Sequence, residues 1–269
     1  MMNRFKKYLA LTRAGIIECI NYRMSLAVMV FGNLLYLTLI YFVWKAIFSS
    51  SGSDVVNGMT FETTMIYLVL ATALFNFMEM YIVWEMGRDI QSGKIALNLI
   101  RPMEYRNYLF WSVSGSFVVN FVFTFIPTFI IVLLVTKGTI ALGINLLYFL
   151  LAVILAVIIN YEIDFIVGTI CLYTESIWGI NIMKQAVVTL LSGATIPLAF
   201  FPDKLRTVID YLPFRAIYDT PLTLLLSDGT DQNMVMTKLA ISFLWVVLMS
   251  MISRLFWKVS IKQVTVNGG

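Results

Sequence analysis

SLAVMVFGNLLYLTLIYFVWKAIF, residues 25–48, carries one charged side chain, Lys45, in 24 positions. A helix of about 20 apolar residues crosses the ~30 Å hydrocarbon core of a bilayer. The stretch follows Arg4, Lys6 and Lys7, as the apolar part of a signal peptide would, but it is longer than such a part and lacks a small-residue cleavage site. It therefore predicts a retained transmembrane helix.

The rest of the chain repeats this pattern. Of its 269 residues, 60% are hydrophobic and 13% are charged, whereas soluble proteins average about half and a quarter. Comparable apolar runs predict an all-α polytopic membrane protein with six transmembrane helices in a single transmembrane domain, 1–269. The run 145–173 exceeds one crossing, which predicts a tilted helix or one that projects into the cytosol. The expected spans are 25–48, 63–84, 109–135, 145–173, 180–200 and 237–257.

The sequence lacks the residues that several classes of function require. The net charge of +4 is scattered, so we expect no nucleic-acid partner. Histidine is absent, and Cys19 and Cys171 form no CxxC pair, so the sequence predicts no catalytic residues, no metal site and no enzyme activity. The Gly93-Lys94 pair lacks the upstream glycine and the following Ser or Thr of a phosphate-binding loop, so we expect no ATP site.

The basic residues predict the orientation of the spans, because lysine and arginine near short loops resist translocation. Thirteen of the 19 lie in segments that six crossings would place on one side, which predicts that both termini are cytoplasmic. We expect this multi-pass protein to lie in a bacterial plasma membrane. The 49–62 loop holds Asp54 and Glu62 and no basic residue, so we expect it outside. The thirteen are Arg4, Lys6, Lys7, Arg13, Arg23, Arg88, Lys94, Arg101, Arg106, Lys184, Arg254, Lys258 and Lys262.

Residues 1–24 precede the first span and predict an interfacial amphipathic helix. Their apolar positions recur at steps of three or four, the spacing of one helix face. The alternative is an ordinary cytosolic lead-in that only anchors the first span. The apolar positions are Phe5, Tyr8, Leu9, Thr12, Ile16, Cys19 and Ile20.

Residues 85–108 form the predicted cytosolic loop and begin EMGRDIQSGKIALNLIRPMEYR. Both charge signs occur, and Gly87, Gly93 and Pro102 interrupt the stretch. Because a residue before proline is biased away from helical geometry, a helix is expected to end before Pro102. We expect one or two short helices that offer a docking surface to a soluble partner.

Residues 201–236 and the end of the fifth predicted span predict short external or re-entrant helices. Four of the six prolines fall here, at 197, 202, 213 and 221, and proline interrupts a continuous helix. The apolar segments 198–201 and 222–226 are too hydrophobic for a free aqueous loop. These helices are expected either to dip into the outer leaflet or to cap the external mouth of the protein.

Together these stretches resemble the ABC-2-type permeases, the membrane subunits of ATP-binding-cassette exporters. GRDIQSGKIALNLIRP at 87–102 resembles the family's segment before the third span, and SGATIPLAFFPDKL at 192–205 with LPFRAIYDTP at 212–221 resembles its signature between spans five and six. The resemblance is greatest to the branch of paired six-span permeases.

The resemblance implies partners rather than a cofactor on this chain. A second permease subunit, either a homologous different chain or an identical copy, would complete a pathway in membrane lipid. A cytosolic ABC ATPase dimer would bind ATP and Mg. The resemblance also implies that five loop residues couple to the ATPase, although each could instead be a solvated loop residue or a headgroup contact. They are Arg88, Asp89, Gly93, Lys94 and Arg101.

Three acids fall within predicted spans, where a charge costs about 2.5–3.5 kcal/mol. They are Glu79, Glu162 and Asp164. Glu162 and Asp164 are two positions apart, which on a helix separates them by about 200°, so both cannot line one groove. Each acid has either a substrate-pathway role or a structural or coupling role.

The predicted function is outward transport of an amphipathic or lipid-like compound or a peptide, as in multidrug or peptide efflux, driven by a separate ATPase. One alternative is an ion-coupled secondary transporter that uses the three acids as a proton relay. Another is a membrane immunity or scaffold protein that binds a peptide or lipid without moving it.

Overall fold

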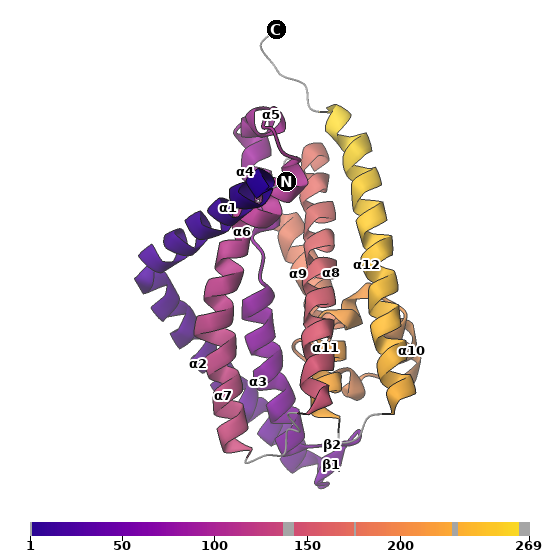
Figure 1. Cartoon of the computed structure of the whole chain (residues 1–269). Helices are drawn as coiled ribbons and strands as arrows, with labels where there is room; N and C mark the ends of the chain where they lie inside the picture. Colours follow the sequence, from indigo (N-terminus) through magenta and orange to yellow (C-terminus); the bar gives the residue numbers. More distant parts are fainter. Residues whose placement is uncertain (1, 137–142, 175, 228–230, 264–269) are drawn as a thin grey trace.

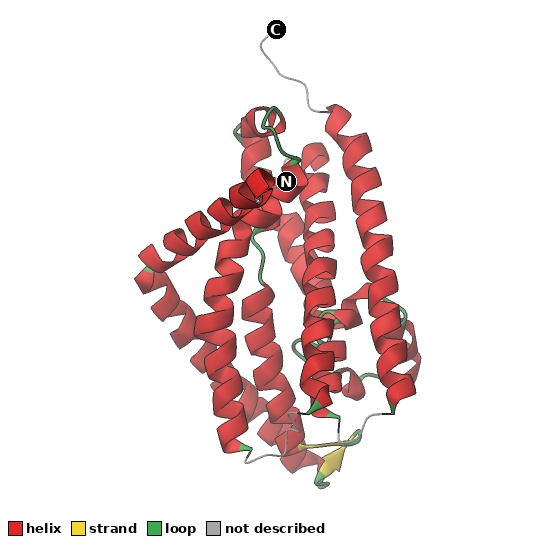
Figure 2. Ribbon diagram, viewed as in Figure 1, coloured by secondary structure: helices red, strands yellow, loops and turns green. Residues whose placement is uncertain are grey.

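The computed structural model describes residues 2–136, 143–174, 176–227 and 231–263, and the described chain is almost entirely helical (Figure 2). This confirms the all-α prediction. A two-stranded antiparallel hairpin, β1 (Val55–Val56) and β2 (Met59–Thr60), pairs Val55 with Thr60. The longer helices are α1 (Met2–Asn21), α2 (Arg23–Ser51), α3 (Phe61–Met78), α4 (Ile82–Gln91), α6 (Tyr105–Asn120), α7 (Ile126–Val135), α8 (Ile144–Thr174), α9 (Trp178–Leu191) and α12 (Gln232–Ser260).

The remaining helical elements are short. Two α-helical pieces, α10 (Asp203–Asp210) and α11 (Asp219–Leu226), follow α9, and α5 (Lys94–Leu99) follows α4. A π-helical turn, Phe121–Phe125, joins α6 to α7. Single 3₁₀ turns occupy Leu198–Phe200, Pro213–Ala216 and Ile261–Gln263.

Most of the long helices run side by side, whereas α1 lies across them near one end, and the two ends of the bundle differ (Figure 1). The end that carries α1, α4, α5 and the last turns of α12 also carries most of the segments predicted to be cytosolic. The opposite end carries the β-hairpin, α10 and α11. The segments that the basic residues assign to opposite sides of a membrane are therefore separated along the bundle, while the direction of insertion stays a prediction.

Within the described ranges, five helical stretches are long and apolar enough to cross a membrane. The α8 helix has 31 residues and is about 46 Å long, so it exceeds one crossing as its sequence predicts. The five stretches are Ala27–Ser51, Phe61–Gln91, Tyr105–Val135, Ile144–Thr174 and Gln232–Ser260.

The expected span 180–200 is wrong as a continuous helix, and the count of six crossings is not confirmed. The corresponding helix, α9, has 14 residues and ends at Leu191. Gly193 follows in the left-handed conformation, with a φ of 82°, and Pro197 lacks the N–H that a helix needs. The chain therefore turns before it has the length of a span.

The expected span 63–84 is also interrupted, although it has no proline or glycine at the break. The α3 helix ends at Met78, and Glu79 takes an extended conformation before α4 begins. Two asparagines satisfy carbonyls near the break: Asn160 Nδ2 donates to Met78 O at 2.8 Å, and Asn120 Nδ2 donates to Asn76 O at 3.1 Å. Such donors allow irregular backbone at membrane depth.

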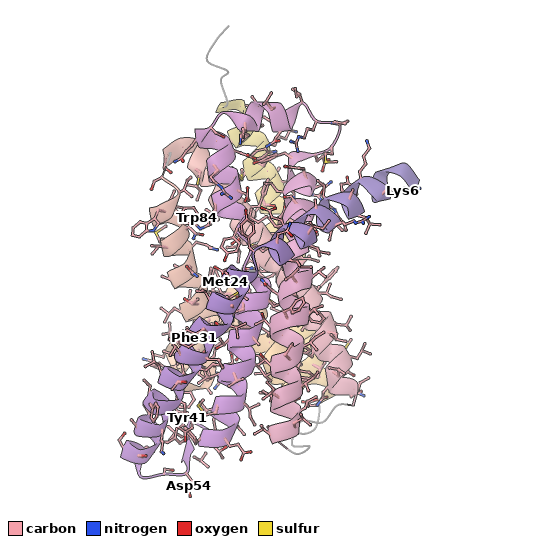
Figure 3. All side chains as sticks on the ribbon, turned by 90° about the vertical axis from the view of Figure 1, so that its left-hand side faces the viewer. Lys6, Met24, Phe31, Tyr41, Asp54 and Trp84 are labelled. Atoms are coloured by element: carbon pink, nitrogen blue, oxygen red, sulfur yellow. The ribbon has the colours of Figure 1, made fainter. Side chains whose placement is uncertain are left out.

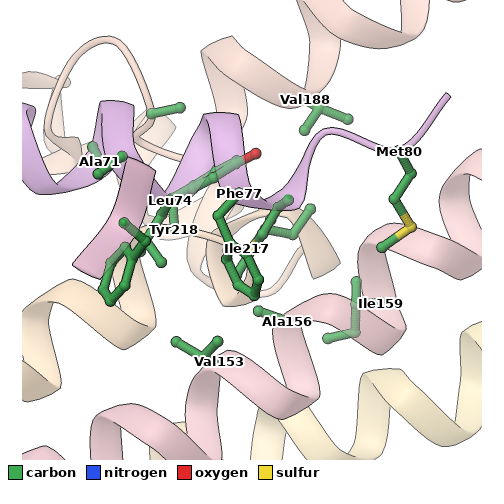
Figure 4. Close-up of a cluster of buried hydrophobic side chains, with 14 of the residues drawn as sticks. Ala71, Leu74, Phe77, Met80, Val153, Ala156, Ile159, Val188, Ile217 and Tyr218 are labelled. Carbon is green, nitrogen blue, oxygen red and sulfur yellow. The ribbon is translucent and has the colours of Figure 1, made fainter. Parts of the chain in front are cut away.

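The core of the bundle lies where α3, α8, α9 and the segment before α11 meet (Figure 4). Leu74 and Phe77 of α3 face Val153 and Ala156 of α8, and Ile217 closes the cluster. By contrast, α2 is mostly exposed, as Met24 and Phe31 illustrate (Figure 3). This outward apolar surface is what a helix in contact with lipid or another membrane subunit requires.

The α1 helix crosses α6 in direct backbone contact. A Cβ atom on Gly115 would lie 2.4 Å from the carbonyl carbon of Gly15, so neither helix has room for a side chain here. Thr12 and Ser114 hydroxyls hydrogen-bond at 2.6 Å nearby. The predicted amphipathic stripe is therefore partly used against α6, and the tip of α1 at Lys6 projects beyond the bundle (Figure 3).

We predict that Gly115→Ala destabilises the protein by about 1–3 kcal/mol, because the added methyl group would overlap the backbone of α1. The unfolding transition in mixed detergent micelles measures this effect. Gly32→Ala in α2 is the matched control, since nothing lies within 4 Å of its Cβ position, and we expect it to be neutral or slightly stabilising. Equal effects of the two substitutions would contradict the close crossing.

Candidate functional site

The α4 and α5 helices form a helical turn at one end of the bundle (Figure 1). Ser92 N–H donates to Arg88 O at 3.0 Å, and Gly93 N–H donates to Ile90 O at 3.1 Å. Gly93 has a φ of 71°, a conformation that glycine adopts without the penalty of a Cβ atom, and α5 starts directly after it. The Ser-Gly pair thus reverses the chain between the two helices.

Four of the five predicted coupling residues lie on the surface of this turn. Arg88, Gly93, Lys94 and Arg101 are exposed. Arg88 pairs with Glu85 one turn away, and the Arg101 guanidinium lies 4.3 Å from the centre of the Tyr108 ring. An exposed ion pair of this kind contributes little to stability, so these charges are available to a partner.

The fifth residue, Asp89, has a different place. Its Oδ2 atom accepts hydrogen bonds from Asn98 Nδ2 at 2.6 Å and from the Tyr105 hydroxyl at 2.9 Å. These bonds connect α4 to α5 and to the first residue of α6. Asp89 therefore positions the turn against the bundle rather than presenting its charge.

Apolar side chains share the exposed surface with these cations. Ile100 is 80% exposed and Leu97 is 64% exposed, and both lie on the same short segment as Lys94 and Arg101. We call the surface formed by Arg88, Lys94, Leu97, Ile100 and Arg101 the turn surface. Exposed apolar groups ringed by charge are typical of a protein interaction site.

Close contacts at two glycines hold α4 against α8 and against Ile177, the residue before α9. A Cβ atom on Gly87 would lie 2.5 Å from the Ile177 side chain, and one on Gly168 would lie 2.9 Å from Met86 Sδ. Gly87 and Met86 belong to α4, whereas Gly168 belongs to α8. A displacement of α4 must therefore move α8 or separate this packing.

Glu162 of α8 is enclosed by polar groups of two other helices. It forms an ion pair with Arg106 of α6, and its side chain is only 2% exposed. Ser250 Oγ donates to Glu162 Oε1 at 2.8 Å, and Ser253 Oγ donates to Oε2. The Tyr161 hydroxyl donates to the Arg106 backbone oxygen at 2.6 Å. The carboxylate thus ties α8 to both α6 and α12.

Asp164 faces α9 instead, as its spacing from Glu162 requires. Its Oδ1 atom lies 2.9 Å from Lys184 Nζ, and its side chain is fully buried. Glu79, at the break between α3 and α4, lines a small polar pocket with Asn160 and Lys184. The three acids therefore occupy two sites: Glu162 alone, and Glu79 near the Asp164–Lys184 pair.

Two of these partners were missed as site residues by sequence reasoning. Arg106 and Lys184 were counted only as charges that set orientation. A lysine inside an expected span was a usable signal, because a charge there needs a counter-ion. Ser250 and Ser253 gave no comparable signal, since serine is common in membrane helices. In the part of the chain that the structure describes, no three His, Cys, Asp or Glu side chains gather as a metal site.

Comparison with known proteins identifies a family over most of the chain. A family model described as ABC-2 family transporter protein matches residues 34–268. The match includes the turn surface, the buried acids and the segment between α9 and α12. No curated protein matches the chain.

We predict that Glu162→Gln lowers the stability of the protein by about 3–5 kcal/mol, because it leaves the Arg106 cation partly buried without its carboxylate. Unfolding in mixed micelles provides the measurement. The double variant with Arg106→Met should recover part of the loss, since no uncompensated charge remains.

Glu85→Gln is the control for this substitution. It removes the same carboxylate chemistry from the exposed pair with Arg88, where we expect less than about 1 kcal/mol. If Glu162→Gln were no more destabilising than Glu85→Gln, the Glu162 site would not hold α8 to its neighbours.

Proposed function

The chain belongs to the ABC-2 family of transporter proteins, and from that premise we propose that it is the permease subunit of an exporter that moves an amphipathic or lipid-like compound or a peptide outward. It is a multi-pass membrane protein whose family works with an ABC ATPase. In the proposal, a dimer of that ATPase binds ATP and Mg, and this chain supplies the pathway without catalysing hydrolysis.

The turn surface carries this proposal. It presents cations and large apolar side chains at one end of the bundle, on a turn that Asp89 attaches to α6. An ATPase bound to this surface would move α4 directly and, through the contact of Met86 with Gly168, would move α8. The same end carries α1, which lies against α6 and is proposed as a second contact.

The break at Glu79 is the hinge of the proposed movement of α4. Because α3 and α4 are separate helices, α4 can change its angle without unfolding the apolar part of the span. Such element ends are where hinges absorb changes in backbone angle. The Asp164–Lys184 pair lies beside this break, which supports a coupling role for the acids.

The apolar surface of the subunit indicates what surrounds it. The α2 and α12 helices expose apolar side chains along most of their length, as Phe31 and Phe243 show. We propose that lipid and a second permease, identical or homologous, cover these helices in a bacterial plasma membrane, with both termini in the cytoplasm.

The test is co-purification of the tagged chain with the ABC ATPase encoded nearest to it, followed by measurement of ATP hydrolysis in liposomes. We predict that the double charge reversal Lys94→Glu and Arg101→Glu weakens association about tenfold, because it inverts the charge of the turn surface. Hydrolysis by the reconstituted complex should fall in parallel.

Lys204→Glu is the matched control, since Lys204 is an exposed cation on α10 at the other end of the bundle. It should leave association unchanged. Undiminished co-purification of the double variant would reject the turn surface as the ATPase contact. Transport driven by a pH gradient in liposomes that contain this chain alone would reject the ATP-driven mechanism in favour of ion coupling.

A further inference from the structure

A cavity of about 430 Å³ opens at the end of the bundle that carries the β-hairpin. Its walls come from segments far apart in the sequence: β2 and α3 on one side, and α10, α11 and α12 on the other. The cavity is distinct from the turn surface, which lies at the opposite end (Figure 1). The proposed function assigns it no role.

Three cations line this cavity: Arg206, Arg215 and Lys238. Arg215 is already neutralised, because its Nε atom lies 2.9 Å from Asp219 Oδ2 and its Nη1 atom pairs with Asp210. Three cations and two carboxylates give this group of side chains a net charge of +1. Because both carboxylates pair with Arg215, the positive charge without a partner belongs to the other two cations.

Lys238 and Arg206 carry that excess. Lys238 Nζ donates to Thr223 Oγ1 at 2.7 Å, a neutral partner, and among the described residues no carboxylate lies within 4 Å of it. Arg206 likewise has no carboxylate within 4 Å among these residues, and it is exposed on α10. A half-buried lysine is stabilised by an opposite charge close to it. Among the described residues, the carboxylates of Asp210 and Asp219 already pair with Arg215, so an anion from outside is the expected partner.

The surroundings of the cavity indicate where that anion comes from. Met59 and Ile66 form an apolar wall beside the cations. On α10, Leu205 is 43% exposed and Val208 is 59% exposed, and Tyr211, just beyond the helix, is 72% exposed. These side chains recur every three residues next to Arg206, which is the pattern of a helix that lies in the headgroup region of a bilayer.

We infer that this cavity binds the phosphate group of an anionic membrane lipid from the leaflet on the side of the β-hairpin. Lys238 and Arg206 provide charge-assisted donors to the phosphate oxygens, while the acyl chains leave along the apolar wall. This site goes beyond the proposed function and does not depend on an ATPase. It would hold whether the lipid is cargo or a structural component.

The test is native mass spectrometry of the full chain in a neutral detergent. The purified protein is titrated with phosphatidylglycerol, with zwitterionic phosphatidylcholine, or with phosphatidylglycerol in the presence of inorganic phosphate. We expect phosphatidylglycerol to bind more tightly than phosphatidylcholine. Lys238→Met and Arg206→Gln should each weaken phosphatidylglycerol binding about tenfold, as expected for loss of a hydrogen bond to a charged group.

Two further variants distinguish loss of the lipid site from a change in net charge and from misfolding. Lys258→Met removes an exposed lysine from the same helix at its opposite end and should leave binding unchanged. Lys238→Arg keeps the charge and should retain most of the binding. If Lys238→Met is poorly folded, the exposed Arg206→Gln substitution tests the site independently.

The proposal is overturned if the two lipids bind equally or if Lys238→Met and Arg206→Gln both bind phosphatidylglycerol like the unchanged protein. An equal loss in Lys258→Met would also overturn it, because the effect would then be one of net charge. Displacement of phosphatidylglycerol by an equal concentration of inorganic phosphate would overturn the lipid assignment, since the acyl chains would then contribute nothing.

Discussion

Hydrocarbon offers no hydrogen-bond partners, and this constraint explains how the bundle is held together. Each charge and each free backbone carbonyl at membrane depth must be satisfied by another part of the chain. The α8 helix meets this requirement on two faces, with Glu162 bonded to α6 and α12 and Asp164 bonded to α9. A single helix therefore fixes the positions of three others, two through ion pairs and α12 through serine hydrogen bonds to a carboxylate, in addition to its apolar packing.

The same constraint permits the interruption between α3 and α4. An extended residue within a span would normally leave carbonyls unpaired, but Asn160 and Asn120 reach across from α8 and α6 to donate to them. The break can thus persist without a proline or a glycine. Glu79 lies at the break and lines a pocket together with Lys184. A movement of the backbone at the break therefore changes the surroundings of the buried charges.

The two ends of the bundle are built in different ways. At one end, Asp89 and the close contacts of Gly87 and Gly168 make the turn between α4 and α5 a rigid extension of the helices. At the other, glycine and proline divide the chain into short pieces whose polar groups surround a cavity. Rigid packing suits the transmission of force, whereas short pieces bring distant cations together around a ligand.

The sequence by itself determined the membrane class, the approximate positions of five of the six expected apolar spans and the opposite faces of Glu162 and Asp164. It also placed Arg88, Lys94 and Arg101 on an exposed turn. These properties depend on hydropathy and helical period, which are local along the chain. Only the tertiary structure decided that α9 is too short for a span, that α3 and α4 are separate, and that Arg106 and Lys184 neutralise the acids. A counter-ion is selected by which helices pack together, and Arg106 lies 56 residues from Glu162, so no local pattern could pair them.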